Sequence, residues 1–231
     1  MNAAELIAAT WPPDATHAMG SVTLRDGAGG GKRVSAASVQ GPLVESDLDA
    51  ADAPLYVVWP GQDDLDAALA ARGYAVVDPT LILSCAAVDL AHPAPPPVSG
   101  FSVWPPLQVQ KEIWANGGVG PARLSIMNRA VDPKVSILGR AKDKPAGTAF
   151  VAIHGGTAMI HAVEVRPDLR RCGLGTHMMR HAARWAMAHG ADRVSVLVTA
   201  ANDAAIALYR GLGLTGGQCY HYRVRPEGSR P

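Results

Sequence analysis

The chain has 231 residues, of which 48% are hydrophobic and 18% are charged, and its 21 basic residues nearly balance its 20 acidic ones. A hydrophobic fraction of this size excludes a disordered protein, and a formal net charge of +1 excludes a strongly basic nucleic-acid-binding protein. We therefore expect a folded protein with no nucleic-acid partner.

The cysteine pattern and the hydropathy of the chain predict the cellular compartment of the protein. Cys85, Cys172 and Cys219 are odd in number and widely spaced, so neither a disulfide framework nor a zinc cluster is expected. The first residues include Glu5 and Asp14 without a basic start, and no run of about 18 apolar residues occurs. These patterns predict a cytoplasmic protein with no membrane partner.

The first ninety residues predict a mixture of helices and strands. The expected elements in chain order are a helix over 2–9, strands over 22–25, 34–39 and 55–59, a helix around 65–69, and strands over 74–77 and 81–88. The prolines within 92–99 predict an extended connector. We therefore expect two parts, 1–95 and 99–231, each of ordinary domain size.

The second part has a clearer pattern. The expected elements are a helix over 104–114, strands over 135–140, 148–154 and 158–165, an amphipathic helix over 174–189, a strand over 194–199, a helix over 202–211 and a strand over 219–224. The first three strands follow one another through short turns and predict an antiparallel meander. The helix that follows them requires a crossover, so we expect an α/β fold with a mixed (α+β) sheet flanked by helices.

One segment with two glycines carries the strongest chemical signal. The predicted strand ends at Val165, and Gly173 and Gly175 follow where the next helix begins. Backbone N–H groups at a helix start form an anion pocket, and glycines let a phosphate approach the backbone. Arg170 and Arg171 would add charged donors. The pattern alone is also compatible with an ordinary helix start and surface arginines, because Gly-x-Gly is a short motif.

A second glycine-rich segment, over 26–32, does not fit a nucleotide-binding P-loop. Asp26 stands where that motif has its first glycine, and Arg33 replaces the Ser or Thr that would bind magnesium. A flexible hairpin turn is the better interpretation. His177 and His181 share a helix face, but no third ligand accompanies them, so we expect a solvated basic face and no metal.

Two segments together resemble a known family. The pattern Arg-x-x-Gly-x-Gly over 170–175 resembles the pyrophosphate-loop signature of the GNAT superfamily of N-acetyltransferases. The segment over 202–214, with Asn202, Tyr209 and Gly213, resembles that family's second signature. The order and the strand-loop-helix-strand-helix context agree, and the resemblance covers about residues 99–224. It implies a GNAT-like fold with a central mixed, splayed sheet.

The resemblance also implies a function and a set of partners. A GNAT enzyme takes acetyl-CoA as co-substrate and transfers the acetyl group to a primary amine of a small molecule or peptide, by direct attack in a ternary complex. In such proteins two adjacent parallel strands separate, and the pantetheine arm pairs with the exposed backbone as an extra strand would. No metal is implied, and a monomer or a homodimer is expected.

The resemblance assigns residues to the cofactor. Val163 and Val165 would pair with pantetheine, the Val165 N–H would polarise the thioester carbonyl, and Asn202 would hold the cofactor arm. An alternative for Asn202 is a plain helix N-cap, and the two roles are compatible. The full set implied in cofactor binding is Val163, Val165, Arg170, Arg171, Cys172, Gly173, Leu174, Gly175, Thr176, Asn202 and Tyr209. Cys172 belongs to it through its backbone, because the chemistry needs no acyl-cysteine.

The family chemistry needs an acid and a base. Tyr209 is the expected acid that protonates the CoA thiolate, the alternative being a Tyr packed on its own helix. The amine must lose a proton, and the candidate bases are Glu164 and His161. Strand alternation places Glu164 on the face opposite His161 unless a bulge intervenes, so each also has a structural alternative.

The acceptor site and the role of the first part are the remaining expectations. Trp114, Arg123 and Met127 flank a glycine-rich segment, 117–120, where the family builds its acceptor pocket; ordinary helix packing is the alternative. Residues 65–74 faintly resemble the closing helix of a GNAT fold. The chain thus resembles a tandem GNAT protein in which the part over 1–95 is degenerate. The alternative is that the part over 1–95 is an accessory α/β half. A non-catalytic acyl-CoA sensor is the alternative function.

Overall fold

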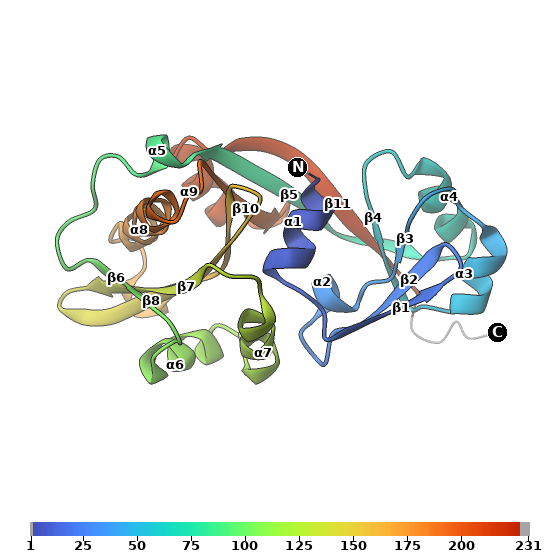
Figure 1. The fold of residues 1–231 in the computed structure, drawn as a ribbon, viewed down its shortest axis with the longest axis horizontal. Coiled ribbons are helices and arrows are strands. Elements are labelled where there is room, and N and C mark those ends of the chain that lie inside the picture. The colour runs from blue at the N-terminus through green and yellow to red at the C-terminus, as the bar shows by residue number, and fades with distance from the viewer. Residues whose placement is uncertain (1, 227–231) are drawn as a thin grey trace. The chain divides into compact units, whose positions relative to one another are not determined.

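The structure is a computed structural model that describes residues 2–226 (Figure 1). The described chain forms two compact units, each discontinuous in sequence. Unit 1 holds residues 2–12, 82–198 and 202–216, and unit 2 holds residues 13–81, 199–201 and 217–226. The division of the sequence into a degenerate or accessory part over 1–95 and a catalytic part over 99–231 stays a prediction. Their end residues 1 and 227–231 lie outside the described residues.

The sheet of unit 1 is mixed. Its strands are β6 (Gly100–Val103), β7 (Lys134–Ala141), β8 (Lys144–His154), β9 (Thr157–Val165) and β10 (Arg193–Thr199). β6 to β9 pair antiparallel, whereas β10 pairs parallel with β9. The order in this part of the sheet is β5-β10-β9-β8-β7-β6, where β5 is Ala75–Ala86. The predicted meander and mixed sheet are confirmed. The crossover between β9 and β10 contains α8 (Leu174–Ala188).

The remaining elements of unit 1 are short. They are α1 (Ala3–Thr10), α5 (Ala87–Leu90), α6 (Gln108–Asn116), α7 (Pro121–Arg129), the 3₁₀ turn η1 (Pro167–Leu169) and α9 (Asp203–Gly211). β5 (Ala75–Ala86) and β11 (Thr215–Val224) each contribute residues to both units.

Different helices cover the two faces of this sheet (Figure 1). On one face α8 packs over β7 and β8, and a Cβ at Gly147 would lie 2.9 Å from Met178 Sδ. On the other face Gln110 of α6 donates to Thr148 Oγ1 at 3.2 Å, and α1 also packs on β8 and β9. Gly147 and Thr148 point to opposite faces because side chains alternate along a strand.

Unit 2 has its own core. Its elements are β1 (Ala15–Met19), β2 (Val22–Asp26), α2 (Lys32–Ser35), β3 (Ser38–Val39), α3 (Glu45–Ala51), β4 (Leu55–Val58) and α4 (Asp63–Ala71). β1, β2 and β3 form an antiparallel sheet, and β4 pairs antiparallel with β11. Val22, Tyr56, Leu65 and Leu69 are buried in one cluster. Burial of such side chains supplies about 1.5–3 kcal/mol each.

Several predicted elements need correction. The strand expected over 34–39 is the short helix α2 followed by β3, because Gly31, at φ 94°, turns the chain before Lys32. The strands expected over 74–77 and 81–88 are one strand, β5, with Pro79 inside it, and the last two residues of the second expected strand belong to the helix α5. The helix expected from Trp104 begins at Gln108, because Leu107 is its N-cap and the preceding residues form β6 and a turn. The elements β1, α3, β6 and α7 were not predicted. Within residues 2–226, no helix is long and apolar enough to cross a membrane.

Candidate active site

The two parallel strands β9 and β10 separate along their length. Their pairing runs from Thr157 opposite Arg193 to Ile160 opposite Val196 and then stops. β9 nevertheless continues to Val165 and β10 to Thr199. The backbone beyond Ile160 on this side of β9 therefore has donors and acceptors that β10 does not use. This splay gives the geometry into which a further extended chain can pair.

A cavity of about 440 Å³ lies beside the open part of β9. It is lined by Val163, Glu164, Val165, Leu169, Arg170, Arg171, Gly173, Leu174, Gly175, Thr176, Asn202, Ala204, Ala205, Leu208 and Tyr209. We call it the cofactor cavity. Of the residues expected to bind the cofactor, Cys172 is the only one outside this lining; its Sγ donates to the Leu169 carbonyl at 3.0 Å.

The loop before α8 presents backbone donors to this cavity. Gly173 is the N-cap of α8. Its φ of 77° is a backbone conformation that residues other than glycine rarely adopt, and no side chain caps the helix. The first N–H groups of α8 are therefore open to an anion, and the helix dipole favours one there. A Cβ at Gly175 would lie 3.0 Å from Leu208 Cδ2, so glycine permits the close approach of α8 and α9. These observations fit a phosphate-bearing ligand.

Two residues of α9 complete the cofactor cavity. Asn202 caps α9 by accepting from the Ala205 N–H at 3.1 Å through Oδ1. The cap uses only the oxygen, so the side-chain N–H₂ group remains a donor for a ligand. Tyr209 is 7% exposed, and burial raises the pKa of its phenol to about 12. The phenol is therefore protonated at neutral pH and can donate a proton.

A β-bulge in β9 decides which way Glu164 points. In the pairing with β8, His161 lies opposite Phe150 and Glu164 opposite Thr148, so β9 has one extra residue in this stretch. Ala162 in the bulge has φ 48°. The extra residue puts Glu164 on the same face as His161, the face covered by α1 and α6. Simple alternation along β9 would have placed Glu164 on the α8 face.

His161 is held in the core by α1. It is 3% exposed, its ring lies 4.9 Å from that of Trp11, and its Nε2 is 3.0 Å from Thr10 Oγ1. Thr10 Oγ1 donates its proton to the Leu6 carbonyl at 2.7 Å, so His161 Nε2 donates to Thr10. His161 lines neither the cofactor cavity nor the second cavity described next. Its contacts are those of a structural residue.

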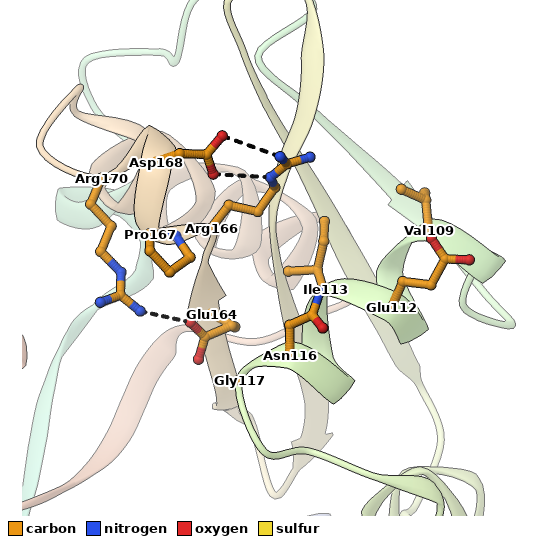
Figure 2. A pocket seen from close by; sticks show the side chains of 10 residues that line it. All are labelled: Val109, Glu112, Ile113, Asn116, Gly117, Glu164, Arg166, Pro167, Asp168 and Arg170. Carbon is orange, nitrogen blue, oxygen red and sulfur yellow. Dashed lines mark hydrogen bonds and ion pairs between the residues drawn. The ribbon is translucent and has the colours of Figure 1, made fainter.

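A second cavity, of about 550 Å³, lies between α6 and the loop that follows β9 (Figure 2). We call it the acceptor cavity. Its lining residues are Val109, Glu112, Ile113, Asn116, Gly117, Glu164, Arg166, Pro167, Asp168 and Arg170. Arg166 pairs with Asp168 at 3.1 Å, and Arg170 pairs with Glu164 at 3.1 Å (Figure 2). Only Glu164 and Arg170 line both cavities.

The residues expected to line an acceptor pocket lie elsewhere. Trp114 and Met127 are fully buried, and Arg123 donates to the Gly118 carbonyl at 3.4 Å. None of the three lines the acceptor cavity. The face of α6 that does line it carries Val109, Glu112, Ile113 and Asn116, a helical i, i+3, i+4, i+7 series that the sequence reasoning missed.

One of the histidines of α8 has a partner from another segment of the chain. His181 Nε2 lies 3.1 Å from Ser99 Oγ, so it packs on the segment before β6 and is less solvated than expected. Within residues 2–226, no three His, Cys, Asp or Glu side chains are grouped so that they could hold a metal ion.

Comparisons with known proteins agree with this geometry. Residues 103–214 match the model of the Acetyltransferase (GNAT) family. The chain is 35% identical over 80 residues to the mycothiol acetyltransferase of Clavibacter michiganensis subsp. michiganensis (strain NCPPB 382), covering 34% of this chain and 26% of that protein. It is 32% identical over 85 residues to the uncharacterized N-acetyltransferase YobR of Bacillus subtilis (strain 168), covering 36% of this chain and 34% of that protein. The chain thus spans only about a quarter to a third of these curated relatives.

Solved structures share the fold over most of the chain. A GCN5-related N-acetyltransferase from Kribbella flavida has a TM-score of 0.71 at 19% identity, covering 97% of this chain and 95% of that one. A tandem GNAT protein from the clavulanic acid biosynthesis pathway has a TM-score of 0.58 at 16% identity, covering 93% and 85%. These likenesses show a shared fold, which is built on a splayed mixed sheet. Residues 103–214 belong to the GNAT family of acetyltransferases, and most of the chain shares the fold of these solved structures.

Proposed function

We propose that the protein is an acetyl-CoA-dependent N-acetyltransferase that acetylates a primary amine of a small molecule or peptide by direct attack. The observation that carries the proposal is the meeting of two cavities at Glu164. One cavity offers backbone donors at a helix N-terminus, and the other offers a carboxylate to an incoming amine.

The groups that line the cofactor cavity support the proposal that CoA binds there. The open backbone over 163–165 would pair with the pantetheine arm, and the N–H groups of the loop from Arg171 to Thr176 would receive the pyrophosphate. The glycines at 173 and 175 leave room for it. Acetyl-CoA supplies the acetyl group as a thioester.

Glu164 and Tyr209 are the proton-transferring residues of the proposal. Glu164 has a side chain 20% exposed, lines the acceptor cavity, and would take a proton from the substrate ammonium group so that the neutral amine can attack. Tyr209 would give its phenolic proton to the sulfur as the C–S bond breaks. Glu164 is preferred to His161 as the base because His161 is buried and bonded to Thr10.

Calorimetry with CoA tests the cofactor site. Arg171→Glu reverses a charge on the exposed loop without touching the core, and we expect CoA to bind at least about tenfold more weakly. Arg193→Glu, an exposed change at the other end of β10, is the matched control and should bind CoA as the wild type does. Unchanged affinity in Arg171→Glu would exclude this loop.

The same titration tests the degenerate first part. We expect about one CoA per chain, because the Arg-x-x-Gly-x-Gly loop occurs once. A stoichiometry of two would reveal a second site and exclude a degenerate repeat.

Thiol release tests the reaction. Acetyl-CoA is incubated with a diamine, an amino sugar, an α-amino acid and a peptide with a free N-terminus, and the free thiol of CoA is followed. Release that depends on one of these amines supports the enzyme. Tight CoA binding without release by any amine would favour the non-catalytic acyl-CoA sensor.

A further inference from the structure

Arg170 lies where the two cavities meet. It follows the turn η1 directly, and its N–H bonds to the Pro167 carbonyl at 3.4 Å. The ion pair between Arg166 and Asp168, at 3.1 Å, spans the same turn. The turn therefore carries the Arg170 side chain back towards the end of β9, which it reaches beside Glu164 (Figure 2).

The guanidinium group of Arg170 makes two bonds to β9. Its Nη2 donates to Glu164 Oε1 at 3.1 Å, and its Nε donates to the Val165 carbonyl at 3.0 Å. A planar guanidinium group with two bonded donors fixes both the direction of its hydrogen bonds and the position of its positive charge. A flexible ammonium group fixes neither in this way. The two bonds therefore tie the Glu164 carboxylate to the backbone of the next residue.

The carboxylate of Glu164 is bounded on its other side by α6. A Cβ at Gly117 would lie 2.4 Å from Glu164 Oε2, so the end of α6 fits closely around this oxygen. Oε1 is taken by Arg170, and Oε2 lies towards the acceptor cavity that Gly117 helps to line. Arg170 beside Oε1 and Gly117 beside Oε2 thus restrict the orientation of the carboxylate.

We propose that Arg170 is a positioning residue for amine deprotonation, which holds Glu164 towards the acceptor cavity and does not act as a pyrophosphate ligand. The proposal rests on the proposed function. In the step it serves, an N–H bond of the substrate ammonium breaks and an O–H bond forms at Glu164 Oε2. The freed lone pair attacks the thioester carbon, the C–S bond breaks, and the sulfur takes the proton of Tyr209. The new amide nitrogen then gives up its second proton, which restores the phenol of Tyr209.

The test combines Arg170→Gln, Arg170→Lys, Glu164→Gln and the double variant Arg170→Gln/Glu164→Gln. With the most active amine of the panel, we expect Arg170→Gln to lower kcat by about 10- to 100-fold, as loss of a positioning partner typically does. Arg170→Lys keeps the positive charge and one donor, so its kcat should lie between those of Arg170→Gln and the wild type. In the Glu164→Gln background, Arg170→Gln should change kcat less than about twofold, because it acts through Glu164. Arg193→Gln is the control for loss of an arginine.

CoA affinity is the second measurement, and it needs no acceptor. Calorimetry should give a CoA dissociation constant for Arg170→Gln within about threefold of the wild type, because the guanidinium bonds to β9. A tenfold weaker affinity that Lys restores would make Arg170 a phosphate ligand and overturn the proposal. Multiplicative effects of the two variants on kcat would also overturn it. A wild type that binds no CoA contradicts the proposed function itself, a different outcome.

Discussion

The indole Nε1 of Trp114 donates a hydrogen bond to the carbonyl oxygen of Ala162 at 2.7 Å. Trp114 is fully buried on α6, and Ala162 lies in the bulge of β9. The bond ties the irregular part of the strand to the helix that lines the acceptor cavity. Because the bulge decides the face on which Glu164 lies, this contact connects a buried core residue to the proposed chemistry.

Trp114→Phe should cost both stability and activity. Phe keeps an aromatic ring but leaves the partly buried Ala162 carbonyl without its donor, at a cost of about 1 kcal/mol in the free energy of unfolding. Urea unfolding measures the stability, and thiol release by the folded variant measures kcat. Trp185→Phe, which removes an indole that stacks on His189, is the matched control. Full activity in folded Trp114→Phe would show that the bulge does not depend on this bond.

Gly117→Ala should impair catalysis with little effect on stability. The added Cβ would lie 2.4 Å from Glu164 Oε2, and the carboxyl group at the end of a flexible side chain would move aside. The backbone of Gly117, at φ −90°, accepts Ala without strain. We expect kcat to fall about 10- to 100-fold, as misplacement of a reacting group does. Gly120→Ala, where a Cβ meets nothing within 4 Å, is the control; equal activity of the two variants would contradict the assignment of Glu164.

Tyr209→Phe should lower turnover far more than it weakens CoA binding. The phenol acts when negative charge develops on the sulfur, so its removal affects the transition state more than the ground state. Loss of a positioned acid costs about 10²–10⁴-fold in rate. Phe preserves the ring, which is 7% exposed, so the fold should survive. Steady-state kinetics and separate CoA calorimetry distinguish a proton donor from a CoA-binding residue. Intact turnover with weak CoA binding would make Tyr209 a binding residue.

Asp66→Asn should remove a pH-dependent part of the stability of unit 2. Asp66 accepts from Arg223 Nε at 2.7 Å and pairs with His221 at 2.7 Å, joining α4 to β11. Hydrogen bonds from Arg223, above all, lower the pKa of Asp66 to about 2 from its ordinary value of 3.8. A lowered pKa stabilises the fold above the unfolded-state value of about 4, and this contribution is lost as the pH falls towards 2.

Chemical unfolding across that pH range measures the effect. The difference in unfolding free energy between wild type and Asp66→Asn should be largest near neutral pH and shrink as the pH falls below about 4. Asp63→Asn, an exposed change in the same helix, is the control. A difference that does not vary with pH would show that the ion pairs of Asp66 do not contribute through its charge.

Local patterns in the sequence were enough to predict the elements around the cofactor cavity. The strand over 158–165, the helix from Leu174 and the helix over 202–211 correspond to β9, α8 and α9. Each has a strong periodicity bounded by a glycine, a proline or an N-cap residue, which are local signals. The same segments contain the signature residues, so the family could also be predicted.

The tertiary structure alone decided the geometry of the acceptor side. The bulge at Ala162 lies in the pairing of β9 with β8, and the Ala162 carbonyl accepts from the indole of Trp114. Both partners lie outside β9, so no local pattern in β9 predicts the bulge. The sequence determined that β9 carries two candidate bases. The bulge and the contact with Thr10 then turned Glu164 to a cavity and His161 to the core, because side-chain direction in a strand depends on register, and register depends on the neighbouring strand.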